Sequence, residues 1–208
     1  MSTLSIQDLG ADRDFQETWD YQEALVKKRR EDSIGDTLLL LEHTPVYTIG
    51  RTRDQSSLQS AAHLPHPVIE LNRGGQGTFH GPGQLVGYAI LDLTKLGRDL
   101  HQHLRNLEEA IIIALGKFGV TAGRRDGLTG VWIGKRKIAS LGVGVRSWVT
   151  MHGFALNVQK NSLPPFQFIT PCGLDGVSMT SAESEAGHPI AMAEMKREIG
   201  IALEKILS

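Results

Sequence analysis

The stretch Arg73-Gly74-Gly75-Gln76-Gly77-Thr78-Phe79-His80-Gly81-Pro82-Gly83-Gln84 combines five glycines with arginine, threonine, phenylalanine and histidine. Glycine has no Cβ, so a ligand or a neighbouring strand can come within backbone contact at these positions. A dinucleotide fingerprint fits poorly, because His80 stands where its third glycine belongs and a strand-like run, residues 85–93, follows in place of a helix. No Gly-Lys-Ser/Thr closes the stretch, which excludes a P-loop. The sequence therefore predicts a Gly-rich binding loop that leads into a strand.

The segments around this loop predict helices packed on a sheet. Apolar residues at helical spacing indicate helices over residues 15–30, 100–118 and 190–207. Short apolar or alternating runs indicate strands, and Gly134-Lys135 suits a hairpin turn between two of them. Because the order is not a regular βαβ winding, the pattern favours an α/β (α+β) domain with a mixed, largely antiparallel sheet. The expected strands are residues 37–41, 46–49, 68–71, 85–93, 131–133, 138–145 and 153–158.

Length and composition set the broad class of the protein. A chain of 208 residues with 40% hydrophobic residues is long enough for one good core, so we expect a single domain over residues 1–208. The formal net charge of −1 gives no global attraction to nucleic acid. Residues 1–14 lack the apolar run of a signal peptide, and no segment approaches the length of a membrane span. We therefore expect a cytoplasmic protein that binds neither nucleic acid nor membranes.

The histidine pairs do not predict a metal site. His63 and His66 have possible metal spacing, but they stand in a proline-containing loop without a visible third ligand. His101 and His103 are two residues apart on an expected helix, so they face different directions and cannot chelate one ion together. The sequence therefore predicts no bound metal.

Cys172 is the only cysteine, and it stands between Pro171 and Gly173. One thiol cannot form an internal disulfide or a thiolate metal cage, which leaves a buried hydrophobe or a nucleophile. The flanking residues indicate a turn, where a side chain and the following amides can face a ligand. Lys137 stands at the start of an expected strand, where its stem can lie along apolar surface and deliver the amine into a cleft. Taken alone, a buried thiol and a solvated lysine remain the commoner outcomes.

Four motifs follow one another along the chain. They are the Gly-rich stretch 73–84, then Gly130-Val131-Trp132-Ile133, then Lys137-Ile138-Ala139 with His152-Gly153-Phe154-Ala155-Leu156-Asn157, and finally Pro171-Cys172-Gly173. In this order they resemble the octanoyltransferases of lipoate synthesis (lipoate-protein ligase B type, LipB). The resemblance spans most of the chain. It implies a single domain related to the biotin and lipoate ligases, and an enzyme that moves an octanoyl group from octanoyl-acyl carrier protein to a lysine of a lipoyl domain.

The resemblance also implies a mechanism based on Cys172 and Lys137. A thiolate is both a nucleophile and a good leaving group, so Cys172 can hold the acyl group as a second thioester. A free cysteine with a pKa of about 8.5 is mostly protonated at neutral pH, and the resemblance assigns its activation to Lys137. Because conversion of a thioester to an amide lowers the free energy, the reaction needs no cofactor. The expected substrate-binding residues are Arg73, Gly74, Gly75, Gln76, Gly77, Thr78, Phe79, His80, Ser140, Leu141, Gly142, Gly153, Phe154 and Ala155.

The acyl chain and the oxyanion need partners of their own. Phe79, Leu141 and Phe154 are candidates for an apolar slot, although ordinary core packing would explain each of them as well. Backbone amides around Cys172, helped by His80 or the glycine loop, are candidates for the oxyanion donors.

The implied partners are octanoyl-acyl carrier protein as donor, and the lipoyl domains of 2-oxoacid dehydrogenases and the glycine cleavage H protein as acceptors. We expect a monomeric enzyme. Acyl carrier proteins are acidic, so a basic docking patch is expected, with Arg124, Arg125, Arg136 and Arg146 as candidates. Two alternatives stay open: an ATP-dependent lipoate or biotin ligase of the same fold, and a non-enzymatic module that binds acyl groups or lipoyl domains.

Overall fold

The computed structural model describes residues 4–50, 58, 64–71, 76–170 and 176–208. In this part of the chain an eight-stranded sheet, in the order β1-β2-β6-β10-β9-β8-β7 with β11 beside β9, lies next to a three-stranded sheet, β4-β3-β5. The elements are β1 Ser5–Arg13, α1 Phe15–Arg30, β2 Thr37–His43, β3 Val46–Ile49, β4 Val68–Glu70, β5 Thr78–His80, β6 Gln84–Ile90, α2 Leu100–Gly116, β7 Gly123–Arg125, β8 Leu128–Ile133, β9 Arg136–Arg146, β10 Val149–Asn157, η3 Lys160–Ser162, η4 Pro164–Phe168, β11 Ser178–Met179, α3 Ala182–Ala186 and α4 Met192–Leu207.

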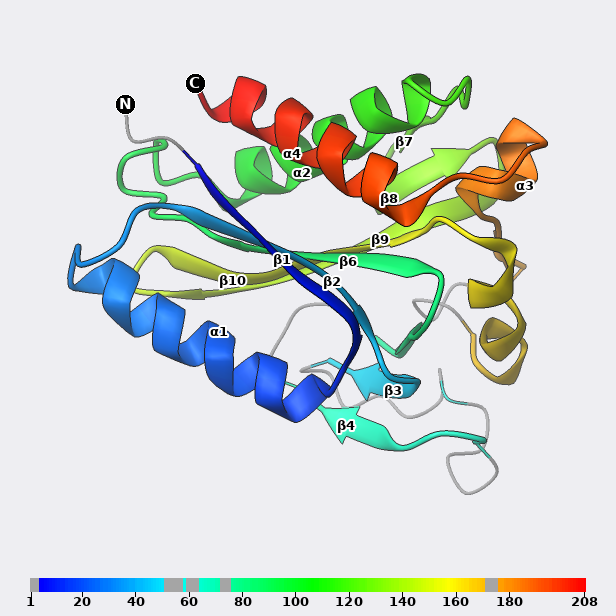
Figure 1. Cartoon of the computed structure of the whole chain (residues 1–208), viewed down its shortest axis with the longest axis horizontal. Coiled ribbons are helices and arrows are strands. Elements are labelled where there is room, and N and C mark those ends of the chain that lie inside the picture. Colours follow the sequence, from blue (N-terminus) through cyan, green and yellow to red (C-terminus); the bar gives the residue numbers. More distant parts are fainter. Residues whose placement is uncertain (1–3, 51–57, 59–63, 72–75, 171–175) are drawn as a thin grey trace.

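The large sheet is covered by helices on both faces. Helices α2 and α4 lie on one face and α1 on the other (Figure 1). Strand β2 has a continuous apolar sequence because both of its faces are buried. Leu38 and Leu40 pack in the hydrophobic cluster with α2 and α4, while Leu39 and Leu41 pack in the cluster under α1. Among the described strands of this sheet most neighbours are antiparallel, and β1 with β2 and β11 with β9 are parallel; in the small sheet β3 is parallel to β4 and antiparallel to β5. The prediction of a mixed, largely antiparallel sheet flanked by helices is confirmed.

Local signals in the sequence set several element boundaries. Helix α1 begins after Asp14, whose side chain accepts the backbone N–H of Glu17 at 3.0 Å, and Asp99 caps α2 in the same way. The predicted turn Gly134-Lys135 joins β8 to β9, with Gly134 at a φ of 58° that favours glycine. None of the helices in the described part of the chain is long and apolar enough to cross a membrane.

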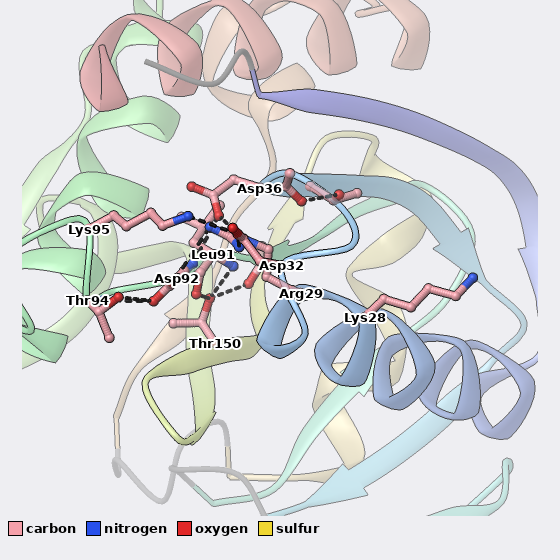
Figure 2. A network of polar contacts seen from close by, with 12 residues as sticks. Lys28, Arg29, Asp32, Asp36, Leu91, Asp92, Thr94, Lys95 and Thr150 are labelled. Atoms are coloured by element: carbon pink, nitrogen blue, oxygen red, sulfur yellow. Dashed lines mark hydrogen bonds and ion pairs between the residues drawn. The ribbon is translucent and has the colours of Figure 1, made fainter.

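Arg29 anchors the C-terminal end of α1 to the large sheet. Its side chain is 2% exposed, and its guanidinium nitrogens lie 2.7 Å from carboxylate oxygens of both Asp32 and Asp36 and 3.5 Å from Asp92 (Figure 2). Asp36 directly precedes β2, and its Oδ1 also accepts the N–H of Asp92 beyond the end of β6. A buried cation stabilises a fold only when it is paired in this way, so these contacts fix α1 against the strands that it covers.

Candidate active site

A pocket lies between segments of the small sheet and strands β9 and β10 of the large one. The register of the two long strands explains how residues distant in sequence meet there: Ser140, Leu141 and Gly142 of β9 lie opposite Ala155, Phe154 and Gly153 of β10. The accessible surface of the lining is mainly apolar, although several of the lining residues have polar side chains. Its residues are Phe15, Leu71, Gln76, Thr78, His80, Tyr88, Ser140, Leu141, Gly142, His152, Gly153, Phe154 and Ala155.

Most of the expected substrate-binding residues are thus brought together. Gln76, Thr78 and His80 from the glycine-rich stretch face the six expected residues of β9 and β10. Gly77 is buried but is not part of the lining. Arg73, Gly74, Gly75 and Cys172 lie outside the described residues.

Phe79 does not line this pocket, in contrast to the expectation. Because side chains alternate along a strand, Thr78 and His80 point into the pocket while Phe79 points away from it. Its ring packs 5.2 Å from the ring of Tyr47 and 5.9 Å from that of Phe166, in a core cluster of its own. Of the three candidates for the acyl slot, only Leu141 and Phe154 lie in the lining.

Four lining residues were missed as site residues: Phe15, Leu71, Tyr88 and His152. Tyr88 reaches the pocket because β6 pairs with β10, which places Tyr88 opposite Gly153. A Cβ on Gly153 would lie 2.2 Å from the carbonyl oxygen of Gly87, so only glycine permits this close approach. His152 was part of a recognised motif, but the other three have no local signal because strand pairing and the packing of α1 bring them in.

Tyr88 is held from behind by a buried histidine. The Nδ1 atom of His43 lies 2.9 Å from the carbonyl oxygen of Arg13, and since a carbonyl only accepts, Nδ1 carries the hydrogen. Burial lowers the pKa of His43 to about 4, so the ring is neutral at pH 7. Its Nε2 therefore accepts the hydroxyl hydrogen of Tyr88 at 2.7 Å. The oxygen of Tyr88 keeps only acceptor capacity for other groups.

A chain of buried amides connects His80 to the backbone beyond β11. The carbonyl oxygen of Thr180 accepts from Nδ2 of Asn157 at 3.1 Å, and Oδ1 of Asn157 accepts from Nε2 of Gln84 at 2.9 Å. The remaining oxygen of Gln84 lies 2.9 Å from Nδ1 of His80. Because the carbonyl can only accept, the orientation of both amides follows, and Nδ1 of His80 must donate. With a ring hydrogen on Nδ1 alone, His80 has an acceptor at Nε2, which lies 3.4 Å from the hydroxyl oxygen of Thr48.

Lys137 is the second residue of β9, and only 3% of it is exposed. It lies between Trp132 of β8 and Met179 of β11 in the strand register, and its carbonyl oxygen accepts the N–H of Thr180 at 2.9 Å. Its amine lies 5.1 Å from the centroid of the Trp132 ring. Strand β11 starts at Ser178, six positions after Cys172 in the sequence. The segment that carries the cysteine therefore leads into the strand beside Lys137.

The four arginines expected in a basic patch do not form one surface. Arg136 and Arg146 stand at opposite ends of β9, which separates them by about 33 Å in an extended strand. Three of the four make ion pairs within the chain: Arg124 with Glu108 and Glu109, Arg136 with Glu185, and Arg146 with Glu23.

Among the described residues, no group of three or more His, Cys, Asp or Glu side chains could hold a metal ion. On α2, His101 is exposed and His103 is buried, so the two face different directions as predicted. His66 packs against the rings of Tyr47 and Phe79, and His63 lies outside the described part of the chain.

Comparison of the whole sequence with known proteins gives its family. A family model described as the lipoyl protein ligase A/B catalytic domain matches residues 14–204. An octanoyltransferase of Geotalea uraniireducens is 48% identical over 204 residues, covering 98% of this chain and 93% of that protein. The octanoyltransferase of Geobacter sulfurreducens is 50% identical over 196 residues, covering 94% of this chain and 81% of its relative.

Solved structures give the same fold at low identity. P. falciparum LipL1 in complex with lipoate superposes with a TM-score of 0.72 at 11% identity, covering 98% of this chain and 62% of that chain. The biotin protein ligase of Aquifex aeolicus in complex with biotin and ATP gives a TM-score of 0.62 at 14% identity, covering 100% of this chain and 71% of that one. The expected relation to the biotin and lipoate ligase fold is confirmed. The chain therefore belongs to the lipoyl protein ligase A/B catalytic-domain family, among its octanoyltransferases, and is an acyltransferase.

Proposed function

We propose that this acyltransferase moves an octanoyl group from octanoyl-acyl carrier protein to a specific lysine of lipoyl domains, through a thioester on Cys172. The acceptors would be the lipoyl domains of 2-oxoacid dehydrogenases and the glycine cleavage H protein, and the reaction would be the first step of endogenous protein lipoylation. One observation carries the proposal. The same strand, β9, contains the buried Lys137 near its start and lines the apolar pocket with three residues further along, 140–142. The similarity to octanoyltransferases supports octanoyl as the group transferred.

The reaction consists of two acyl exchanges. In the first, the Cys172 thiolate attacks the carbonyl carbon of the donor thioester, the donor's carbon–sulfur bond breaks, and the released thiol takes up the proton that Cys172 lost. In the second, the acceptor lysine attacks the new thioester as a free amine, loses a proton, and regenerates the cysteine thiol. No oxidant or nucleotide is consumed, because a thioester is higher in free energy than the amide that replaces it.

Lys137 can serve both exchanges. As an ammonium it favours the thiolate of a nearby cysteine, and as a neutral amine it can take the proton of the incoming lysine. These two forms are microstates of one coupled pair, so we assign the exchanges to the pair as a unit. Backbone amides near Cys172 are the oxyanion donors in this scheme, since Nδ1 of His80 already donates to Gln84 and its Nε2 lies 3.4 Å from the hydroxyl of Thr48.

The proposal is tested by incubating the protein with octanoyl-acyl carrier protein in the absence of nucleotide and measuring its intact mass. We expect one octanoyl adduct, which disappears when a lipoyl domain is added and reappears as octanoyl-lysine on that domain. Transfer that occurs only with ATP and free octanoate would identify a ligase instead. Stable association without any adduct would identify a binding module.

Replacing Leu141 by alanine is expected to change the preferred acyl length. Leu141 lines the pocket, and its removal leaves room for about two further methylene groups, each worth roughly 0.8 kcal/mol when buried. The ratio of decanoyl to octanoyl transfer should therefore rise roughly tenfold, measured as relative kcat/KM in competition. Val143→Ala is the matched control, because Val143 lies on the same strand outside the lining. Equal ratios in the two variants would exclude Leu141 from the acyl slot.

A further inference from the structure

Gly130 of β8 provides the space into which the end of the Lys137 side chain fits. A Cβ built on Gly130 would lie 2.5 Å from Cε of Lys137, 3.1 Å from its Nζ and 2.8 Å from the carbonyl oxygen of Ala139. Contacts under 3.0 Å are essentially never seen for a real Cβ, and the φ of Gly130, 132°, also favours glycine. The lysine side chain therefore lies directly on the Cα of Gly130, and any larger residue there must displace it.

Glu108 of α2 holds the backbone of Gly130 in place. Its side chain is 0% exposed, and its Oε1 accepts the N–H of Gly130 at 2.9 Å. Its Oε2 accepts from Nη1 of Arg105 at 2.6 Å and from Nε of Arg124 at 3.0 Å. A buried carboxylate is stable only with such partners, and with both oxygens engaged its plane cannot turn. The position of Gly130 is thus fixed from the helix behind the sheet.

Trp132 bounds the lysine from another direction. The amine of Lys137 lies 5.1 Å from its ring centroid, and the guanidinium of Arg125 lies 4.8 Å from the same centroid. The face of an indole ring attracts cations within about 6 Å. The register pairs Trp132 with Lys137 across β8 and β9, so the ring is held beside the lysine by the sheet itself.

We propose that Glu108, Gly130 and Trp132 are positioning residues that together set the location of the Lys137 amine. We call them the lysine seat. Glu108 acts through the backbone of Gly130, Gly130 gives the side chain its space, and Trp132 limits the direction of the amine. This gives the motif Gly130–Ile133 a task that the two acyl exchanges do not assign to it. The inference rests on the role proposed above for Lys137.

Gly130→Ala is the first test of the lysine seat. A displacement of about 1 Å of a catalytic group can cost on the order of 100-fold, so we expect octanoyl transfer to slow by about that factor. Gly134→Ala is the matched control: Gly134 also has a positive φ, 58°, in the same hairpin, but nothing lies within 4 Å of its added Cβ. It should leave the rate within about twofold of wild type. Glu108→Gln keeps an oxygen for Gly130 and should cost less than Glu108→Ala, for which we expect about tenfold.

A second readout separates positioning from mere destabilisation. Cys172 is the only cysteine, so alkylation by iodoacetamide reports its thiolate alone. The pH profile of alkylation in Gly130→Ala and Glu108→Ala should move toward the profile of Lys137→Ala, while that of Gly134→Ala should match wild type. In a Lys137→Ala background, Gly130→Ala should add less than a twofold loss of transfer. Full additivity of the two losses would overturn the seat.

The position of the amine can also be observed without activity. The protein is labelled with lysine carrying 13C at Cε and observed by NMR, and the Lys137 signal is assigned by its loss in Lys137→Arg. The ring current of Trp132 should shift this signal. The signal should therefore move in Gly130→Ala and in Trp132→Leu. An unmoved signal in both variants overturns the seat. A signal that moves while transfer and alkylation stay unchanged keeps the seat and instead removes the proposed role of Lys137. Trp132→Leu retains buried apolar bulk, so the test does not depend on Glu108→Ala folding.

Discussion

Replacing Cys172 by alanine is expected to reduce nucleotide-free octanoyl transfer by at least about 10⁴-fold, since removing the nucleophile of a covalent enzyme leaves only the contributions of binding and oxyanion stabilisation. Intact mass should show no octanoyl adduct on the variant. The chain has no second cysteine that could accept the acyl group, so the background of this experiment is unusually low. The measurement is single-turnover transfer from octanoyl-acyl carrier protein to a lipoyl domain.

Binding of the octanoylated donor serves as a positive control that the variant is folded. The pocket is lined by residues of β5, β9 and β10, and the substitution removes a single thiol, so Cys172→Ala should still bind the octanoylated donor with an affinity close to wild type. The ligase alternative is tested by measuring transfer with ATP and free octanoate. A ligase would not need Cys172, so the variant and wild type would then transfer at the same rate. Adduct formation on Cys172→Ala, or transfer above about one per cent of the wild-type rate, would refute the nucleophile assignment.

The predictable parts of the fold are those where the local pattern and the tertiary environment agree. Helix α1 begins and ends at the predicted residues, because Asp14 caps it and its apolar residues face the sheet. Strand β1 was not predicted, since it forms an edge of the sheet and most of its residues are at least partly exposed, which leaves little alternation to read. Strands β5 and β11 have only three and two residues, too few for a periodic signal.

The site shows the same division. Nine of the expected binding residues meet in one pocket: Thr78 and His80 share β5, Gln76 stands two residues before that strand, and the other six lie opposite one another on β9 and β10. The expectation that Phe79 lines the pocket is wrong because the pattern predicted only a loop. The structure has a strand that begins at Thr78, and alternate side chains of a strand point to opposite faces. Glu108 has no motif around it, and only the packing of α2 behind β8 makes it a neighbour of Gly130. Contacts of this kind between a helix and a strand depend on the order of the strands in the sheet, which cannot be predicted from a single sequence.

Replacing Lys137 by alanine is expected to slow transfer by about 10² to 10⁴-fold, the usual range for loss of a general acid–base group. Both acyl exchanges should suffer, because the same amine assists thiolate formation and later accepts the proton of the acceptor lysine. Without it, the fraction of Cys172 thiolate should follow a free thiol with a pKa of about 8.5. The acylation rate should then rise nearly tenfold per pH unit from pH 6 to pH 8, whereas the wild-type rate should level off at lower pH.

Two matched variants decide what Lys137 contributes. Lys135→Ala removes an exposed cation two residues away, at the hairpin turn, and should keep the rate within about twofold of wild type. Lys137→Arg retains a positive charge that cannot serve as a base, so it should preserve more of the first exchange than of the second. The two exchanges are resolved by following adduct formation and adduct decay separately by mass. Full-rate acylation in Lys137→Ala, with the pH profile of wild type, would remove the lysine from the mechanism and leave activation of Cys172 to another group.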